Sequence, residues 1–487
     1  MMARATTIVR AAGLCAGLTL ASVAAAGPTP TYTILYRDLD DVAGIGGVTF
    51  INNQAVNNNG DWVAEIDTNN PDTNANTVFV RNFQLVAREN DPVPPAGATI
   101  SSFDSTNINA SGHSAWNLFL RNLTSSTDSG VYFGTNLLIQ ESMISTATGF
   151  SDGTPYIGFF EVKLNDAGNL LVMASVDDPA IPSTVDRALV LLTLDNGALV
   201  SETVLWKEGD FLPGQTEPIA DFGTGPNSFA FNNLGQAMFV VDLAGSTATD
   251  GAIYIDDMRI AQEGSASPIP GRNWATISTS AKVHLNNNGG YVHTGTLSGD
   301  TATDTIIIRN GEKFVQEGDT HPDIDGFVFT SFGTGPVYIS DNNDVLWFGD
   351  WNDPNTAVDT GLFINDQLLL RENTTTIDGN LVTTIRGIED GYSLSPNGRY
   401  VLARVVLNGN QDALVLIDRG EQGGGCPADW DGNGQVNSTD ISAFLTAWLD
   451  SLNNQDLNAD FDGNQVVNSS DISAFLTAWL DAVQNGC

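Results

Sequence analysis

A turn motif that recurs at nearly constant intervals is the feature that most constrains the fold of this chain. At five places an apolar residue is followed by Asn, two variable residues and Gly, and two degenerate copies come after them. The seven copies are Asn57–Gly60, Asn109–Gly112, Asn165–Gly168, Asn232–Gly235, Asn286–Gly289, Ser340–Asn343 and Ser395–Gly398. Their spacings are 52, 56, 67, 54, 54 and 55 residues. A fixed period of this length is typical of solenoids, propellers and arrays.

Each turn lies between short runs of β-forming residues. "NSFAF" and "AMFVVDL" flank the turn at Asn232, and the run "GAIYID" and a run ending in Glu follow. Four strands per unit, repeated seven times, predict a seven-bladed β-propeller over residues 27–419. The strand "YTILYRD" near the start would complete the last blade beside "ALVLID" and so close the ring. A double β-sandwich and a ring of six or eight blades remain alternatives.

A Glu recurs at the end of the fourth run, often within the pattern EGD-x-x-P. The equivalent residues are Glu89, Glu141, Glu208, Glu263, Glu317 and Glu372. Because they follow the repeat, we expect them to accept backbone hydrogen bonds at the blade ends, and catalysis is the alternative. The two motifs together resemble tandem repeats of secreted bacterial proteins that have varied C-terminal anchors.

A second, much closer repeat lies near the C-terminus. "DWDGNGQVNSTDISAFLTAWLD" starts at Asp429 and "DFDGNQVVNSSDISAFLTAWLD" starts at Asp460. Each copy places oxygen-bearing groups at positions 1, 3, 5, 7, 9 and 12 of a loop, as a Ca²⁺ site requires. The predicted ligands of two Ca²⁺ ions are Asp429, Asp431, Asn433, Gln435 (carbonyl), Asn437 and Asp440, and Asp460, Asp462, Asn464, Val466 (carbonyl), Asn468 and Asp471. Gln465 replaces the Gly of the first loop at position 6, so we expect weaker binding in the second loop.

Each loop leads into an amphipathic helix. The apolar positions are Ile441, Phe444, Leu445, Trp448 and Leu449 in the first copy, and Ile472, Phe475, Leu476, Trp479 and Leu480 in the second. Since one helix cannot bury such a stripe alone, we expect the two to pack about a local two-fold axis. The alternative is an acidic, turn-rich tail with two amphipathic helices.

This loop-and-helix pair resembles a dockerin. "GGGC" ends at Cys426 and "NGC" ends the chain at Cys487, as in GC-type dockerins of secreted planctomycete proteins. The resemblance implies a small α-helical domain of paired EF-hand-like units over residues 426–487, behind a Gly-rich linker at residues 420–425. It also implies docking to a cohesin-like or other surface anchoring protein through Ser438, Thr439, Ser469 and Ser470.

The N-terminus predicts export. Residues 1–26 combine Arg4 and Arg10, an apolar run and an A-x-A cleavage site, which is the pattern of a secretory signal peptide. Cleavage would leave Cys426 and Cys487, which bracket the duplicated module. In an oxidising compartment we expect these two to form a disulfide, and two free thiols are the alternative.

Charge narrows the range of partners. The chain has 58 acidic and 19 basic residues, a formal charge of −39. This charge disfavours nucleic acid and anionic membrane surfaces as partners, and no later run is apolar enough for a membrane span.

Two features of the sequence could contribute to an active site. The four histidines form no metal-binding spacing, and we expect His284 and His293 to be exposed on strands near one turn. "WFGDWND" could place Trp347 and Trp351 as a sugar-binding platform near Asp350, although packing within the core is the simpler interpretation.

The sequence therefore predicts a secreted or cell-surface protein whose propeller binds or scaffolds, with glycan as one possible ligand, attached through a calcium-dependent dockerin-like module. The alternative is a carbohydrate-active enzyme, either a glycoside hydrolase or a polysaccharide lyase. An acidic cluster that breaks the repeat at one mouth of the ring would favour the enzyme, and sevenfold-regular mouths would favour the binder.

Overall fold

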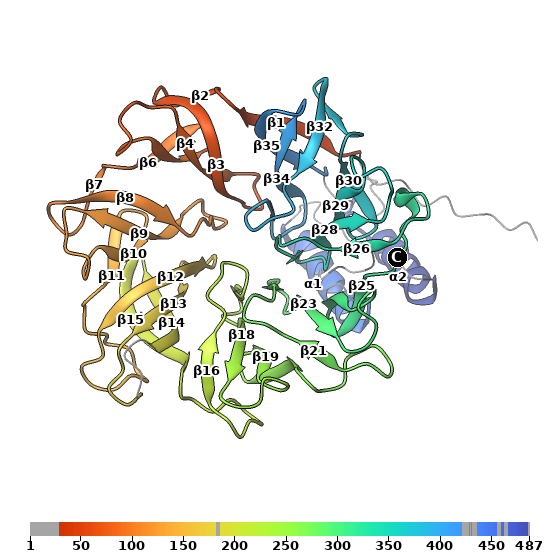
Figure 1. Ribbon diagram of the computed structural model, residues 1–487. Helices are drawn as coiled ribbons and strands as arrows, with labels where there is room; N and C mark the ends of the chain where they lie inside the picture. The colour runs from red at the N-terminus through yellow and green to blue at the C-terminus, as the bar shows by residue number, and fades with distance from the viewer. Residues whose placement is uncertain are drawn as a thin grey trace, which may run out of the picture.

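The computed structural model describes residues 29–181, 186–420, 428, 430, 436–454, 459–461 and 466–485. Within residues 29–420 it contains seven antiparallel sheets arranged around a central axis (Figure 1). The predicted seven-bladed β-propeller is confirmed. The only helical segment described in this range is the short 3₁₀ turn η1 (Pro322–Ile324).

The first three blades follow one another along the chain. Blade 1 consists of β2 (Asp41–Val42), β3 (Gly46–Val56), β4 (Trp62–Thr68), β5 (Thr77–Arg81) and β6 (Gln84–Arg88). Blade 2 consists of β7 (Pro92–Val93), β8 (Ala98–Asp104), β9 (Ala115–Arg121), β10 (Ser129–Phe133) and β11 (Asn136–Gln140). Blade 3 consists of β12 (Tyr156–Leu164), β13 (Leu170–Val176), β14 (Asp186–Asp195) and β15 (Ala198–Lys207).

In the next three blades the innermost strand is split into two short pieces that pair with the same neighbour. Blade 4 consists of β16 (Ile219–Phe222), β17 (Phe229–Phe231), β18 (Ala237–Leu243), β19 (Gly251–Ile255) and β20 (Met258–Gln262). Blade 5 consists of β21 (Trp274–Thr276), β22 (Val283–Leu285), β23 (Tyr291–Leu297), β24 (Thr305–Arg309) and β25 (Glu312–Gln316). Blade 6 consists of β26 (Phe329–Ser331), β27 (Tyr338–Ile339), β28 (Val345–Trp351), β29 (Thr360–Ile364) and β30 (Gln367–Arg371).

The last blade joins the two ends of the propeller. It consists of β31 (Thr376–Ile377), β32 (Asn380–Ile385), β33 (Tyr392–Leu394), β34 (Tyr400–Leu407), β35 (Gln411–Asp418) and the N-terminal strand β1 (Thr31–Arg37). β1 pairs antiparallel with β35, from Thr31 opposite Asp418 to Arg37 opposite Ala413. The predicted closure of the ring by the N-terminal strand is therefore confirmed, and Figure 1 shows β1 beside β35.

The hydrophobic core of the ring is divided among the blade interfaces. Seven clusters of buried side chains each combine residues of two adjacent blades. The cluster that contains Leu35, Ala64 and Leu414 joins the last blade to the first. Because each sheet is covered on both faces, its middle strands are buried almost throughout. All seven residues of β13 are buried, for example.

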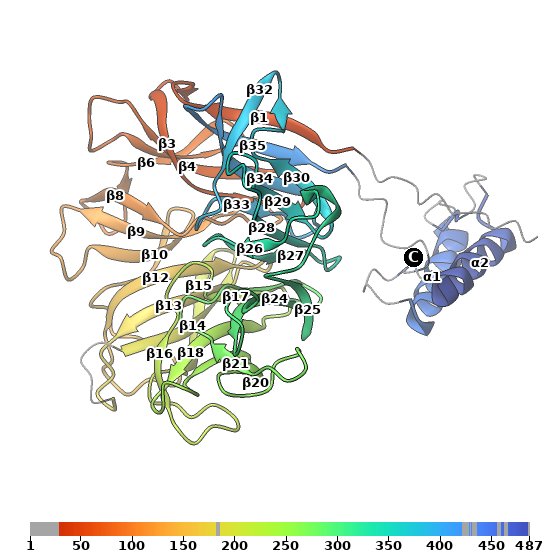
Figure 2. The ribbon, with the colours of Figure 1, turned by 45° about the vertical axis from the view of Figure 1, so that its right-hand side comes forward.

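Outside the ring the structure describes two α-helices. They are α1 (Ser438–Asn454) and α2 (Ser469–Asn485), and Figure 2 shows them side by side. Neither helix of the described residues has the length and apolar character that a membrane span needs.

Candidate functional site: the central channel and its acidic mouth

All seven predicted turns occupy the same place in their blades, between the innermost strand and the next. In each turn the backbone N–H of the fourth residue donates to the carbonyl of the first, at distances of 2.8 to 3.3 Å. The fourth residue has a positive φ, from +61° at Asn343 to +84° at Gly168, a conformation that Gly and Asn adopt with little strain. The turn prediction is confirmed at each position.

The asparagines at the start of these turns also link neighbouring blades. The Oδ1 of Asn232 accepts from the N–H groups of Leu234 and Gln236 in its own turn, at 3.1 and 2.9 Å. Its Nδ2 donates to the carbonyl of Asn286, the equivalent residue of the next blade, at 2.9 Å. Four further Nδ2 groups make the same bond to the next blade, those of Asn57, Asn109, Asn165 and Asn286. The asparagines thus form a hydrogen-bonded chain around this end of the ring.

The two degenerate turns replace this bond with others. The hydroxyl of Ser340 accepts from two N–H groups of its turn, at 3.2 and 3.0 Å, but Ser has no amide to donate onward. Instead the backbone N–H of Asp341 donates to the carbonyl of Pro396 at 2.6 Å. Asn397 then bonds both the Oδ1 and the carbonyl of Asn58 in the first blade. The chain of contacts therefore continues around the closure.

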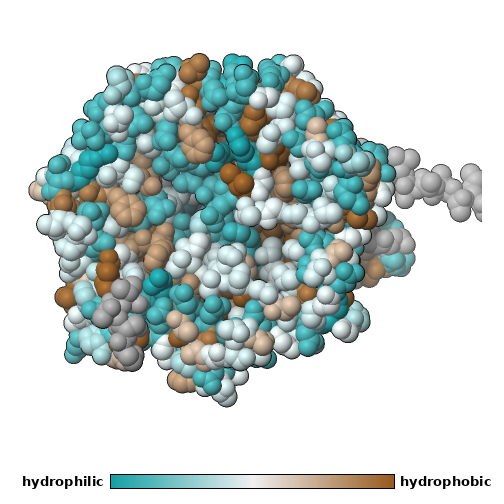
Figure 3. Space-filling view, in the orientation of Figure 1, coloured by the Kyte–Doolittle hydropathy of each residue, from teal (hydrophilic) through white to brown (hydrophobic). Residues whose placement is uncertain are grey.

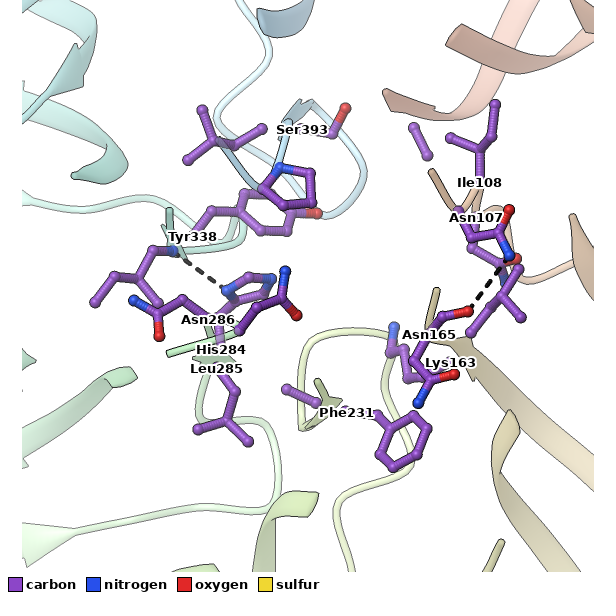
Figure 4. A pocket seen from close by; sticks show the side chains of 18 of the residues that line it. Asn107, Ile108, Lys163, Asn165, Phe231, His284, Leu285, Asn286, Tyr338 and Ser393 are labelled. Atoms are coloured by element: carbon purple, nitrogen blue, oxygen red, sulfur yellow. Dashed lines mark hydrogen bonds between the residues drawn. The ribbon is translucent and has the colours of Figure 1, made fainter. Parts of the chain in front are cut away.

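The innermost strands surround a central channel. A cavity of about 210 Å³ is lined by residues from every blade, and Figure 4 shows some of their side chains around the opening. The Nδ1 of His284 accepts from the N–H of Ile339 at 3.2 Å, and its ring lies edge-on to Tyr338, with 4.9 Å between the centroids. On the face shown in Figure 3, hydrophilic residues lie beside the centre of the ring, with apolar residues among them.

A second cavity, of about 340 Å³, shares lining residues with this channel and is strongly acidic. Its carboxylates come from three blades, and we call Asp104, Glu161, Glu389 and Asp390 the acidic mouth. Asp104 precedes Asn109 by five residues and Glu161 precedes Asn165 by four. At no more than about 3.3 Å per residue, the acidic mouth lies within about 17 Å of the turns along the innermost strands.

Burial and the neighbouring carboxylates raise the pKa values of two acids of the acidic mouth, Asp104 and Asp390. Burial, and next the nearby Glu161, raise the pKa of Asp104 to about 7. Burial, together with Glu161 and Glu389, raises the pKa of Asp390 to about 6. Glu65, which accepts from the cavity-lining Asn53, has its pKa raised to about 8, mainly by burial. A bound positive charge would relieve this repulsion.

Two lysines partly neutralise the cluster. The Nζ of Lys163 lies 3.4 Å from Glu161 and donates to the carbonyl of Pro226. The Nζ of Lys282 lies 3.2 Å from Glu389, joining blade 5 to blade 7. The cluster therefore has an excess of acidic groups over the ammonium groups that contact it.

Several polar atoms that line the channel and the acidic mouth are buried without a hydrogen-bond partner among the described residues. They are Oε1 of Gln54, Oγ1 of Thr106, Nδ2 of Asn227 and Oγ of Ser393. The exposed fractions of Gln54, Asn227 and Ser393 are 6%, 8% and 5%. Since an unpaired buried polar group is costly, such atoms mark a place where a ligand or water completes the bonding.

Four of the six repeated glutamates accept the backbone hydrogen bonds that the sequence predicts, and a backbone hydrogen bond from Arg187 lies beside a fifth, Glu208. Glu89, Glu141, Glu263 and Glu317 each accept a backbone N–H near the start of the third strand of their blade, at 3.0 to 3.3 Å. Glu372 instead accepts the hydroxyl of Thr360. These contacts tie the end of the outer strand to its neighbour.

The structure corrects the expectation about the two histidines and decides between the two interpretations of Trp347 and Trp351. His293 is only 1% exposed, packed against Trp274, and burial lowers its pKa to about 4. His284 lies within the channel, where burial lowers its pKa to about 3. The prediction that both are exposed was wrong, because the face of the sheet that carries His293 is covered and His284 is half-buried in the channel lining. Trp347 and Trp351 are buried in the core between blades 5 and 6, so they form no exposed platform.

The two C-terminal helices are related by matching contacts. The rings of Phe444 and Phe475 stack with their centroids 4.3 Å apart. The indole N–H of Trp448 donates to the carbonyl of Asn468 at 2.8 Å, and that of Trp479 donates to the carbonyl of Asn437 at 2.9 Å. This reciprocity agrees with packing about a local two-fold axis.

The predicted apolar stripes are buried only in part. Phe444 and Phe475 are fully buried, but four leucines of the stripes are 37% to 55% exposed: Leu445, Leu449, Leu476 and Leu480. The two helices therefore pack together as expected, but their contact leaves these leucines partly exposed. The helices meet along the phenylalanine and tryptophan positions, and the leucines lie to one side of that line.

The structure describes half of the predicted calcium ligands. Asp440 and Asp471, at position 12 of the loops, are fully buried and accept the N–H of Asn437 and of Asn468 at 2.9 and 2.8 Å. Asp460 and Val466 are also described. Asp429, Asp431, Asn433, Gln435, Asp462 and Asn464 lie outside the described residues, as do Cys426, Cys487 and the predicted signal peptide. Among the predicted partner-binding residues, Ser438, Thr439 and Ser469 are exposed and Ser470 is half-buried.

Comparison with known proteins adds little about function. A family model described as a family of unknown function (DUF7453) matches residues 18–260, and no curated protein matches. Among solved structures, the chain is similar to an oligogalacturonate lyase from Vibrio parahaemolyticus at 12% identity and a TM-score of 0.42, over 81% of this chain and 98% of that one. An oligogalacturonate lyase in complex with manganese matches at 12% identity and a TM-score of 0.37, over 81% and 99% of the two chains. TolB from Acinetobacter baumannii matches at 12% identity and a TM-score of 0.28, over 66% and 79%. Similarity this low carries no argument about activity.

Proposed function

We propose that this protein is exported, that its propeller binds a ligand at the acidic mouth, and that its C-terminal module attaches it, in a calcium-dependent manner, to a cell-surface or extracellular assembly. The observation that carries the binding role is the set of buried polar atoms without partners among the described residues, at the junction of the channel and the acidic mouth.

The calcium role is supported by the chemistry of the donor groups. The described ligand candidates offer carboxylate, amide and carbonyl oxygens, which are the groups that Ca²⁺ prefers. Asp440 and Asp471 are fully buried at the starts of their helices, where a carboxylate needs compensating partners. When bound, calcium would supply positive charge that joins each loop to its helix. The side chains of Asp440 and Asp471 already fix the loop backbone at position 9 through Asn437 and Asn468.

The attachment role is supported by the surface of the helix pair. Ser438, Thr439 and Ser469 are exposed at the helix starts, and Leu449 and Leu480 are 55% and 51% exposed on the helices. Exposed apolar side chains next to hydroxyl groups are typical of a protein interaction surface. The partner would be a cohesin-like or other surface anchoring protein.

The test of attachment measures how much of the exported full chain stays bound to the cell surface or extracellular assembly, with and without a calcium chelator. We expect the chelator, and the double variant Asp440→Ala/Asp471→Ala, to release the protein. The matched control Asp257→Ala changes an exposed aspartate of the propeller and should leave retention unchanged. Retention that survives both the chelator and the double variant would contradict the proposal.

A carbohydrate-active enzyme is the second candidate, and one observation favours it. The acidic mouth breaks the sevenfold repeat, and it pairs Asp104, whose pKa is raised to about 7, with the nearby carboxylate of Glu161. A carboxyl group held protonated near neutral pH beside a second carboxylate is the arrangement of glycoside hydrolysis. A panel of polysaccharides incubated with the full chain tests this. Cleavage that Asp104→Asn and Glu161→Gln both abolish would make the protein an enzyme, and no cleavage of any member would leave binding as the function.

A further inference from the structure

The acidic mouth combines negative charge with unmet hydrogen bonding. Its four carboxylates come from blades 2, 3 and 7 and face two lysines. Asp104, Glu161 and Asp390 line the same cavity, where their like charges repel one another. A ligand that carries a positive charge would be attracted to this place, since the surrounding protein leaves an excess of carboxylates.

The unpartnered atoms show what else such a ligand must provide. Gln54 uses its Nε2 to donate to the carbonyl of Asp390 at 2.7 Å, which fixes the orientation of the amide. Its buried Oε1 accepts from nothing within the described residues and so requires a donor. The buried Nδ2 of Asn227 is a donor in the same cavity and requires an acceptor.

A bare metal ion would satisfy the carboxylates and Gln54 but offers no acceptor to Asn227. A hydroxyl group both donates and accepts, and an ammonium group carries charge and donates. The aromatic rings of Tyr338 and Phe160 line the same cavity and can contact the apolar face of a sugar-like ring. We propose that the acidic mouth binds a small polyhydroxylated primary amine, with the chemistry of an amino sugar. This inference rests on the proposed ligand-binding role of the propeller and specifies its ligand.

The residues of this site have distinct roles in binding the ligand. Glu161 and Asp104 bind the ammonium group, and Gln54 and Asn227 bind hydroxyl groups. Lys163 competes with the ligand, because its ammonium lies 3.4 Å from Glu161. Removing the lysine and removing the carboxylate should therefore change amine affinity in opposite directions.

The experiment is calorimetric titration of the full, calcium-loaded chain with D-glucosamine and, as the matched neutral probe, D-glucose. We expect glucosamine to bind at least about tenfold more tightly than glucose, the scale of one incompletely screened charge interaction. Equal affinities would overturn the proposal, and so would the absence of binding by both sugars.

Two variants and a control make the test specific. Lys163→Met should tighten glucosamine binding and Glu161→Gln should weaken it, each by about threefold to tenfold, with glucose affinity unchanged in both. Glu312→Gln, on an exposed residue of β25 in another blade, should change neither. If Glu161→Gln does not fold, Lys163→Met decides: unchanged or weaker glucosamine binding contradicts the site. Calcium-dependent retention is measured in a separate experiment. A failure of glucosamine binding therefore does not affect the attachment proposal, and a failure of calcium-dependent retention does not affect the proposed amine site.

Discussion

The chain of asparagines around the ring makes a quantitative prediction about stability. Asn232 is 2% exposed. Its side chain accepts two turn N–H groups and donates to the carbonyl of Asn286 in the next blade. Asn232→Ala leaves these three backbone groups without their side-chain partner. Because each buried group left unpaired costs about 1–3 kcal/mol and water can reach part of the turn, we expect a loss of about 2–4 kcal/mol.

Substitution by Ser and Asp separates the two roles of Asn232. Ser occurs naturally at two of the seven turns, and the hydroxyl of Ser340 accepts both turn N–H groups. Asn232→Ser should therefore keep the turn bonds, lose only the bond to the next blade and cost about 1 kcal/mol. Asn232→Asp should be the most damaging, because a buried carboxylate oxygen would face the carbonyl of Asn286.

The assay is urea unfolding of the full chain followed by tryptophan fluorescence, with hydrogen exchange at the turns of blades 4 and 5. The expected order of stability is wild type, Ser, Ala, Asp. A Ser variant as unstable as the Ala variant would refute the separation of roles. An Ala variant as stable as wild type would refute the importance of the chain itself.

Two further predictions concern the ring. The pKa of Glu65 is raised to about 8, mainly by burial. The folded state therefore retains a proton that the unfolded chain loses above about pH 4.5. The stability that this proton contributes is lost as the pH rises towards 8. Glu65→Gln should therefore lose less stability than wild type between pH 5 and pH 8 in urea titrations, and parallel pH curves would contradict the assignment. Deleting residues 29–37 removes β1, the strand that pairs with β35. The variant should melt at a lower temperature and exchange the amide hydrogens of β35 faster. Unchanged exchange at β35 would show that β1 does not close the ring.

The repeat allowed most of the propeller to be predicted from sequence. The turn at Asn232 and its six equivalents fixed the number of blades, because each copy marks the same corner of one sheet. The bond from Asn232 to Asn286 was not foreseen, since a turn needs only the Oδ1 acceptor and the Nδ2 donor acquires a partner only when blades pack side by side. Asn in five of the seven copies, where Ser also builds the turn, was the signal that could have revealed it.

The acidic mouth was harder to predict, for a geometric reason. Asp104, Glu161 and Asp390 are separated by more than fifty residues, and each looks like an ordinary polar residue within its own repeat. Only the closed ring brings them together. The burial of His293 was missed because alternation along a strand predicts one exposed face, whereas both faces of a propeller sheet are covered. In the helices, the pattern identified apolar residues but could not show that Leu449 lies beside the helix contact.

A count of the calcium ions bound to the full chain, by calorimetry and by native mass spectrometry after removal of chelator, tests the two predicted calcium sites directly. We expect two ions, one lost in Asp440→Ala and the other in Asp471→Ala. The second loop should bind more weakly, and Gln465→Gly should tighten it. No calcium bound by the wild-type chain, or two ions retained by the double variant, would contradict this prediction.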